Sequence, residues 1–260
     1  MKTSLIISNY NWAPALDIVL RSVGHQVQLP DEVIVADDGS GLTTQNLIND
    51  WVSRLDCPLV HVWQPDTDFR LARVRNLAIM KAVGDHLIFI DNDCLLPAHF
   101  IKNHRYLTEP NTLVAGGRSL LTQEQTQAIL SNPSGDISHV FRAFKHADLS
   151  WIPFRRRVPL SWRAVRGCNI GVLKEDILTV SGFDEGYTGW GREDSDLAIR
   201  MGKRACKIIS GRLAACVSHL FHEEHSRQNL GANEALLSTV MSASAWTPRK
   251  SCLRPLDNEG

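Results

Sequence analysis

The sequence predicts an α/β fold, with a mostly parallel central sheet flanked by helices in a single domain. Short apolar runs alternate with segments of helical periodicity, a pattern typical of strand–helix–strand units. The runs are apolar at consecutive positions, so both faces of each strand are expected to be buried. With 260 residues, 43% of them hydrophobic and 22% charged, the chain is long enough to bury a substantial core.

The first half of the chain alternates most regularly. Its first helix shows the expected spacing of apolar side chains at Leu16, Val19, Leu20 and Val23. In chain order we expect a strand at Thr3–Ser8, a helix at Pro14–Val23, a strand at Glu32–Ala36, a helix at Thr43–Leu55, a strand at Leu59–Trp63, a helix at Leu71–Val83 and a strand at His86–Ile90. In such a sheet, ligands bind in the loops at the carboxyl ends of the strands.

The second half is less regular. We expect a strand at Asn111–Ser119 and a short helix at Gln123–Leu130, and regular structure resumes near Gly167 and at Asp194–Ala205. We therefore divide the chain into a first half at residues 1–95, a more variable half at 96–230, and a C-terminal tail at 231–260 that is expected to be partly disordered.

Composition and charge argue against several classes of protein. The 28 basic side chains balance 28 acidic ones, which argues against nucleic acid as the main partner. No apolar run approaches the roughly 18 residues of a membrane span, and Met1–Asn11 resembles a strand more than a signal peptide. The six cysteines are scattered without a CxxC pair, which fits reduced thiols in the cytoplasm.

Two acids stand where the fourth predicted strand leaves the core, in the stretch LIFIDNDC. In a turn, the side chains of Asp91 and Asp93 can converge on one divalent cation, and Mg²⁺ or Mn²⁺ prefers oxygen ligands. Neither GxGxxG nor GxxxxGK[ST] follows the first strand, so a bound nucleotide diphosphate would need such a cation to neutralise it. The alternative is that both acids are ordinary turn residues.

Five short motifs carry a resemblance to a known family. They are SNYN (Ser8–Asn11), VADDGS (Val35–Ser40), ARVRN (Ala72–Asn76), DND (Asp91–Asp93) and GWGREDSD (Gly189–Asp196). Together, over about residues 3–225, they resemble family-2 glycosyltransferases of the GT-A fold. The last motif, and FRLARVRN at Phe69–Asn76, are similar to segments of β-1,4-galactosyltransferases and bacterial chondroitin-type polymerases.

The resemblance implies a Rossmann-like GT-A sheet and an inverting glycosyltransferase of bacterial polysaccharide biosynthesis. Such an enzyme moves a hexose or N-acetylhexosamine from a nucleotide diphosphate donor, here expected to be a UDP-sugar, with Mn²⁺ or Mg²⁺ as cofactor. The acceptor would be a hydroxyl of a glycan or of a lipid-diphosphate-linked saccharide, and the product a β-glycoside. Residues 1–95 would bind the nucleotide sugar, and residues 96–230 would bind the acceptor and catalyse. The alternatives are a metal-dependent nucleotidyltransferase and a non-catalytic nucleotide-sugar-binding module.

The resemblance also assigns residues to the donor side. Asp93 would bind the metal directly, with His222 as a further ligand and His219 as the alternative to it. Asp37 and Asp38 would accept hydrogen bonds from the nucleoside, although a turn with a helix N-cap at Ser40 would explain the same residues. The implied nucleotide-binding residues are Ser8, Tyr10, Asn11, Asp37, Asp38, Arg75 and Asp91.

On the acceptor side, the resemblance makes Asp194 the general base for the acceptor hydroxyl, while Glu193 holds the acceptor sugar. Helical spacing places Asp194 on the stripe of Leu197 and Met201 that faces the sheet. A favourably charged helix N-terminus is the alternative explanation for the two acids.

The loop before these acids would bind sugar. Gly189 and Gly191 would serve as hinges of a mobile loop, and Arg192 stands where the galactosyltransferases carry a second glycine. The implied acceptor- or sugar-binding residues are Trp190, Gly191, Cys168 and Asn169. Further along the helix, spacing pairs Asp196 with Arg200 on the outer face.

A basic segment, Arg142–Arg166, stands out in a chain with no net charge. It holds seven Lys and Arg against one acid, with Trp151, Phe154 and Trp162 among them. This composition suits an anionic membrane surface or a lipid-diphosphate acceptor, so we expect peripheral contact with the inner face of the membrane. A solvated loop is the alternative.

Overall fold

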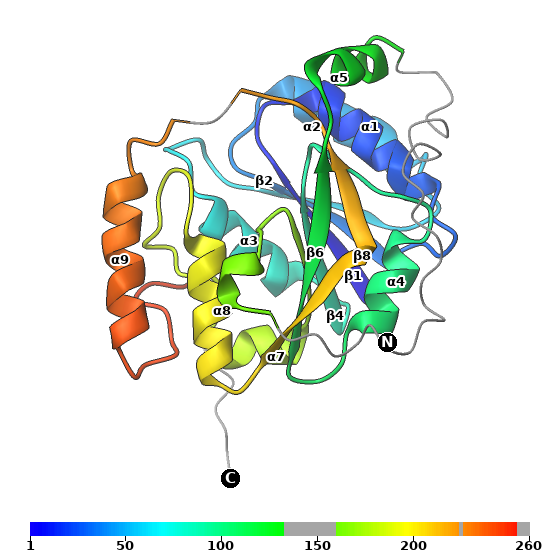
Figure 1. Cartoon of the computed structure of the whole chain (residues 1–260). Coiled ribbons are helices and arrows are strands. Elements are labelled where there is room, and N and C mark those ends of the chain that lie inside the picture. The colour runs from blue at the N-terminus through cyan, green and yellow to red at the C-terminus, as the bar shows by residue number, and fades with distance from the viewer. Residues whose placement is uncertain (133–159, 224–225, 254–260) are drawn as a thin grey trace.

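The computed structural model describes residues 1–132, 160–223 and 226–253. In these ranges one eight-stranded sheet runs through the middle of the molecule (Figure 1). Its strands, in spatial order, are β3 (Leu59–Trp63), β2 (Glu32–Asp37), β1 (Thr3–Asn9), β4 (His86–Asp91), β7 (Asn169–Leu173), β6 (Thr112–Leu120), β8 (Lys207–His219) and β5 (Cys94–Leu95).

The pairing of the strands is mostly parallel in the first half and mixed in the second. β3, β2, β1 and β4 run parallel to one another. β7 runs antiparallel to both β4 and β6, β8 is parallel to β6, and β5 is antiparallel to β8. Because β1, β2 and β4 are parallel, the loops that follow them lie at the same edge of the sheet.

Helices cover both faces of the sheet. α1 (Ala13–Gly24), α2 (Leu42–Val52) and α4 (Phe100–Leu107) pack on one face, around Leu16, Trp51 and Phe100. α3 (Leu71–Lys81), α7 (Lys174–Thr179) and α8 (Glu193–Lys203) pack on the other, around Val74 and Phe183. The remaining described elements are α5 (Gln123–Leu130), a 3₁₀ turn η2 (Trp162–Ala164) and α9 (Leu230–Ser242). α9 lies outermost, beside α8 (Figure 1).

The alternation predicted for the first half is confirmed. Every strand and helix predicted there is present, and the ends differ by at most three residues, as where α2 ends at Val52 instead of Leu55. Beyond β4 the structure contains further elements that we did not predict, namely β5, α4, α7, β8 and α9. α9 occupies the first part of the predicted tail, and residues 254–260 lie outside the described ranges.

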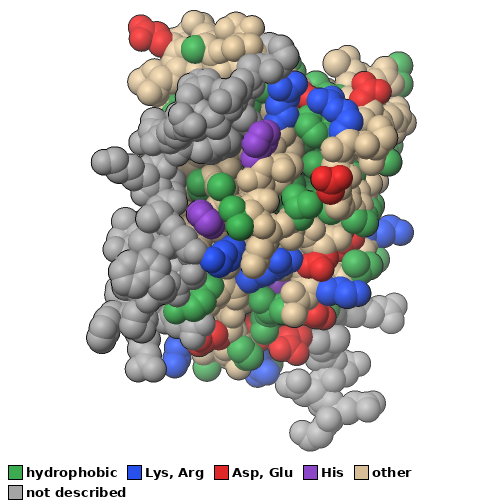
Figure 2. Space-filling view, turned by 90° about the vertical axis from the view of Figure 1, so that its right-hand side faces the viewer, with side chains coloured by type: hydrophobic (Ala, Val, Ile, Leu, Met, Phe, Trp, Pro, Cys, Tyr) green, Lys and Arg blue, Asp and Glu red, His purple; other side chains and the backbone are tan. Residues whose placement is uncertain are grey.

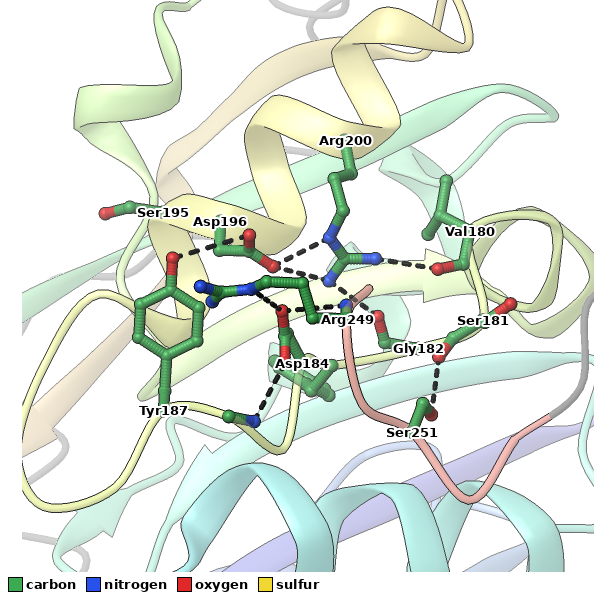
Figure 3. A network of polar contacts seen from close by, with 12 residues as sticks. Val180, Ser181, Gly182, Asp184, Tyr187, Ser195, Asp196, Arg200, Arg249 and Ser251 are labelled. Carbon is green, nitrogen blue, oxygen red and sulfur yellow. Dashed lines mark hydrogen bonds and ion pairs between the residues drawn. The ribbon is translucent and has the colours of Figure 1, made fainter. Parts of the chain in front are cut away.

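The Asp196–Arg200 pair predicted on the outer face of α8 forms, but it is buried. Both side chains are almost wholly inaccessible, with Nη2 of Arg200 2.6 Å from Oδ2 of Asp196. Arg200 also donates to two backbone carbonyls of the loop that follows α7. Beside it, Asp184 accepts hydrogen bonds from the backbone and side chain of Arg249 (Figure 3). The predicted position was wrong because this loop and the C-terminal segment cover that side of α8.

The surface carries mixed charge on the face shown in Figure 2, where Lys and Arg side chains lie among acidic and apolar ones. None of the helices in the described ranges is long and apolar enough to span a bilayer. The six cysteines, all of which are described, are free thiols. Most of the basic segment Arg142–Arg166, up to Pro159, lies outside the described residues. In its described part, the guanidinium of Arg163 lies 4.3 Å from the centre of the Trp162 ring.

Candidate functional site

The polar loops after β1, β2 and β4 meet at one edge of the sheet. The register places Ser8 beside Asp91 and Asn9 beside Asp37 on neighbouring strands. The Asn92 side chain joins the loops by donating a 2.7 Å hydrogen bond to Oδ1 of Asn9. Donor-site residues predicted from three separate motifs therefore lie along a single edge.

In the loop after β2, the first acid is held inside the protein. Oδ1 of Asp37 accepts hydrogen bonds from the backbone N–H and hydroxyl of Ser40, and Oδ2 lies 2.9 Å from Nε2 of His61. Burial opposes ionisation, but the contacts with His61 and Ser40 outweigh it and lower the pKa of Asp37. α2 begins at Leu42 with Gly41 as its N-cap, so the alternative of an N-cap at Ser40 is wrong.

The second acid of this loop, Asp38, is also buried. It accepts hydrogen bonds from the side chain of Gln64 and from the backbone N–H of Arg70. Burial raises the pKa of Asp38 despite these contacts. Tyr10 lies nearby with 42% of its surface exposed, and its hydroxyl donates to Asp66 over 3.1 Å. An accessible aromatic ring thus borders the acidic loop, where it can stack on a flat base.

Arg75 links the sheet edge formed by the loops after β1 and β4 to the second half of the chain. Its side chain, on α3, is fully buried. It donates hydrogen bonds to four groups: Oγ of Ser8 at 3.0 Å, Oδ1 of Asp91 at 2.9 Å, Oε1 of Glu193 at 3.3 Å and the carbonyl of Gly167 at 3.0 Å. Only the fork of an arginine can serve so many acceptors at once. The predicted nucleotide-binding and acceptor-binding sides are therefore parts of one network.

The two acids at the start of α8 lie in different environments. Burial raises the pKa of Glu193 to about 7, and the neighbouring Asp194 adds to this rise against the influence of Arg75. Asp194 is partly exposed, and its carboxylate accepts 2.8 Å and 2.6 Å hydrogen bonds from the backbone N–H groups of Gly167 and Ser195. The two neighbouring carboxyls thus differ in burial and in hydrogen-bond partners, which suits them to different roles.

A cluster of possible metal ligands lies at the same edge, formed by Asp93, His219 and His222. Their ligand atoms all lie within 4.8 Å of one another. Nε2 of His222 is 3.2 Å from Oδ2 of Asp93, and Nε2 of His219 is 3.5 Å from Oδ1. The β5–β8 pairing brings the histidines here, because Cys94, next to Asp93, pairs with His219. The structure thus places both histidine candidates together, and neither excludes the other.

The Nδ1 atoms of both imidazoles contact backbone carbonyls, an arrangement that suits Nε2 as the metal-binding atom. Nδ1 of His219 lies 2.8 Å from the Leu220 carbonyl, and Nδ1 of His222 lies 2.7 Å from the Glu223 carbonyl. When each Nδ1–H donates to its carbonyl, Nε2 is left to bind a cation beside Asp93. Two imidazoles favour a transition metal such as Mn²⁺ over Mg²⁺. The hydrogen bond with Asp93 raises the pKa of His222 to about 9, so metal binding must displace a proton.

The acceptor-side residues differ in what their side chains can reach. Trp190 keeps 40% of its surface exposed. Asn169 is 1% exposed, and its amide bonds the carbonyls of Gly117 and Ala215 and the ring of His104. Cys168 is 4% exposed. The sugar-contacting roles of Cys168 and Asn169 stay predictions, and their visible contacts are structural.

Sequence reasoning missed several residues that support the site. Trp12 packs edge-on against His222, with ring centres 6.0 Å apart. His61 and Gln64 hold the two acids after β2, and Asn92 joins the loops. Trp12, His61 and Gln64 lie outside the motifs and Asn92 is the middle residue of DND, but spacing could not reveal their roles, because each acts only through a contact between strands or loops.

Comparison with known sequences identifies relatives that are much longer than this chain. The chondroitin synthase of Pasteurella multocida (strain Pm70) is 30% identical over 255 residues, which cover 85% of this chain and 24% of that protein. The validoxylamine A glucosyltransferase of Streptomyces hygroscopicus subsp. limoneus is 27% identical over 217 residues, covering 76% and 47%. The chain thus spans from about a quarter to about half of the length of these relatives.

Comparison with solved structures confirms the predicted GT-A type α/β fold. TarS residues 1–349 from S. aureus, in complex with UDP-GlcNAc, matches with a TM-score of 0.65 and 16% identity, covering 92% of this chain and 66% of that chain. A mannosyltransferase from Pyrobaculum calidifontis, in complex with GDP-Man and Mn²⁺, matches with a TM-score of 0.60 and 19% identity, covering 84% and 56%.

Two family descriptions match the sequence itself. Residues 154–226 match the description "N-terminal domain of galactosyltransferase". Residues 4–148, more than half of the chain, match the description "Glycosyl transferase family 2". These matches confirm the predicted relationship, including the galactosyltransferase-like second half. The chain belongs to glycosyl transferase family 2.

Proposed function

We propose that the chain is an inverting, metal-dependent glycosyltransferase. It transfers a hexose or N-acetylhexosamine from a UDP-sugar to a hydroxyl of a glycan or lipid-linked saccharide, forming a β-glycosidic bond. The observation that carries this proposal is the Arg75 network. Arg75 bonds both Glu193 and Asp91, and Asp91 lies two residues before Asp93 of the possible metal cluster.

The relatives support the kinds of donor and acceptor. The TarS complex contains UDP-GlcNAc, and the mannosyltransferase complex contains GDP-Man and Mn²⁺. Chondroitin synthases and a hyaluronan synthase, by their names, build polysaccharides. A nucleotide sugar as donor and a growing glycan as acceptor fit both observations. We expect the transfer to take place in the cytoplasm.

Asp93, His219 and His222 would hold the divalent ion, which when bound supplies positive charge to neutralise the diphosphate leaving group. Arg75 binds Oδ1 of Asp91, which supports Asp93 as the direct ligand and Asp91 as a contact to ribose or water. The edge-on contact with Trp12 restrains the His222 ring.

Asp194 would take the proton from the acceptor hydroxyl, and Glu193 would hold the acceptor. Hydrogen bonds from Gly167 and Ser195 orient the Asp194 carboxylate, and its oxygens keep further lone pairs for the hydroxyl. The hydroxyl then attacks the anomeric carbon from the face opposite the leaving group. Inversion of an α-linked donor gives a β-glycoside.

A donor screen tests the proposal. With Mn²⁺ present, we expect one of several UDP-sugars to release UDP slowly, and faster when a glycan acceptor is added. EDTA should stop the release, and added Mn²⁺ should restore it. Full activity in EDTA would contradict the metal role. Release of pyrophosphate from UTP and a sugar phosphate would indicate a nucleotidyltransferase, and binding of UDP-sugars without any turnover would indicate a binding module.

The basic segment Arg142–Arg166 would bring the enzyme to a lipid-linked acceptor at the inner face of the membrane. Its support is the excess of six positive charges and the aromatic residues among them. Most of these residues lie outside the described ranges, so the membrane contact stays a prediction from sequence.

A further inference from the structure

The loop that carries Trp190 is held by a helix to which the proposed chemistry gives no role. The side chain of Asn233, on α9, is only 2% exposed. Its amide nitrogen lies 2.9 Å from the carbonyl oxygen of Gly191, 3.1 Å from that of Thr188 and 3.4 Å from that of Trp190. One side chain thus binds the backbone on both sides of the exposed tryptophan.

The backbone of this loop needs such support. Gly189, Gly191 and Arg192 have φ angles of +69°, +101° and +82°, in the left-handed region. Arg192 carries a side chain, so this conformation is unfavourable for it and must be held by its surroundings. Nη2 of Arg192 lies 2.7 Å from Oε1 of Glu234, the residue after Asn233. α9 therefore holds the loop through two adjacent residues.

The start of α9 also packs directly on the loop. A Cβ atom at Gly189 would lie 2.7 Å from Nδ2 of Asn229, and one at Gly191 would lie 3.5 Å from the Leu230 side chain. The guanidinium of Arg227 lies 5.2 Å from the centre of the Trp190 ring. The start of α9 therefore lies directly against the loop at both glycines.

α9 is itself anchored to α8. Nζ of Lys203, in the last turn of α8, lies within 2.6 Å of the carbonyl oxygens of Val240 and Ala243 near the end of α9. On the other side of the loop, Tyr187 and Asp184 belong to the buried network of Asp196, with Arg200 and Arg249 beside them (Figure 3). The loop at 188–192 therefore lies between α9 on one side and the buried network around Asp196 on the other.

We propose that α9 is a clamp that fixes the acceptor-binding loop, and that Asn233 is its main positioning residue. Asn233 sets the position of Trp190, and the Glu234–Arg192 pair fixes the start of α8, where Glu193 and Asp194 lie. This inference rests on the proposed function for its effect on the acceptor. The clamp itself can be tested without any activity.

The first test uses the full chain with Asn233→Ala and Asn233→Asp. Both changes remove the donor for the loop carbonyls, since a carboxylate cannot donate, and the aspartate keeps the shape of the side chain. We expect amide hydrogen exchange of the 188–192 loop to become faster in both variants. We also expect the acceptor KM to rise by about tenfold to 100-fold, because small displacements of positioning groups have effects of this size. Donor hydrolysis and Mn²⁺-dependent UDP affinity should stay unchanged.

A milder variant and a matched control complete the set. Glu234→Gln weakens the pair with Arg192 at a half-exposed position, so it should fold and show smaller changes in the same direction. Ser238→Ala lies one turn further along α9, where the hydroxyl bonds only the carbonyl of Glu234. This control should behave like the wild type in exchange and in KM.

The outcomes separate the clamp from the proposed function. Unchanged loop exchange in Asn233→Asp and Glu234→Gln would overturn the clamp. Faster exchange with an unchanged acceptor KM would overturn the positioning role and leave Asn233 a structural residue. If the wild type transferred no sugar, the proposed function would fail, and the exchange data would still decide whether α9 holds the loop.

Discussion

Asp194→Asn is expected to lower the rate of sugar transfer by about 10²–10⁴-fold, the usual contribution of a general base. The carboxylate is partly exposed at the start of α8, where hydrogen bonds from Gly167 and Ser195 orient it. An amide of the same shape can keep one of these hydrogen bonds but cannot take up a proton. Affinity for UDP should be nearly unchanged, because the proposed nucleotide site lies at the strand ends, away from Asp194. Steady-state transfer rates and calorimetric UDP binding measure the two quantities.

Glu193→Gln serves as the matched comparison for Asp194→Asn. It should raise the acceptor KM and affect donor hydrolysis less, since its proposed task is to hold the acceptor. Asparagine is still tolerated in the first turn of a helix, so Asp194→Asn should cost no more than about 1 kcal/mol of stability. Wild-type transfer by Asp194→Asn would refute its role as base, whereas unfolding of that variant would indicate that it mainly stabilises the helix.

Arg75→Met should lower the free energy of unfolding by about 3–5 kcal/mol, which is typical when one partner of a buried ion pair is removed. The arginine is fully buried, and its loss leaves the carboxylates of Asp91 and Glu193 without their counter-charge. Urea unfolding followed by circular dichroism measures the change. Donor turnover should be lost as well, because Arg75 joins the two sides of the site.

Two further variants control the Arg75 result. Arg73→Met, on the same helix, removes a 40% exposed side chain that lies 3.5 Å from Glu185, so it should cost less than about 1 kcal/mol. Combining Arg75→Met with Asp91→Asn and Glu193→Gln removes the unpaired charges and should recover part of the stability. If Arg75→Met alone unfolds like the wild type, the network is not the structural centre that we describe.

The sequence predicted the elements of the first half because their pattern is local. Four apolar strands and three helices with clear periodicity follow one another there. α9 was missed because it buries only one apolar side chain, Leu237, and is otherwise attached through polar contacts, so it shows no strong apolar stripe. The long strand β8 was also missed. Its pairing with β6 is interrupted by a change of register opposite Gly116 and Gly117, and such an interruption depends on contacts between strands.

The candidate site was predictable wherever one motif carried the chemistry. The acids after β4 and at the start of α8 were found in this way, and Arg75 joins one acid of each pair, Asp91 and Glu193. Contacts between distant segments could not be derived from spacing. His219 joins Asp93 only through the β5–β8 pairing, and Arg200 is buried only because a loop covers α8.

We propose that a divalent ion on Asp93, His219 and His222 binds the nucleotide diphosphate. Calorimetric titration of UDP into the full chain, with Mn²⁺ and with EDTA, measures this binding in the wild type and in Asp93→Asn. We predict that the wild type binds UDP tightly only with Mn²⁺, that Asp93→Asn abolishes this dependence while keeping its fold, and that Asp91→Asn weakens it less. UDP binding of equal affinity with EDTA, or unchanged Mn²⁺ dependence in Asp93→Asn, would contradict the proposed site.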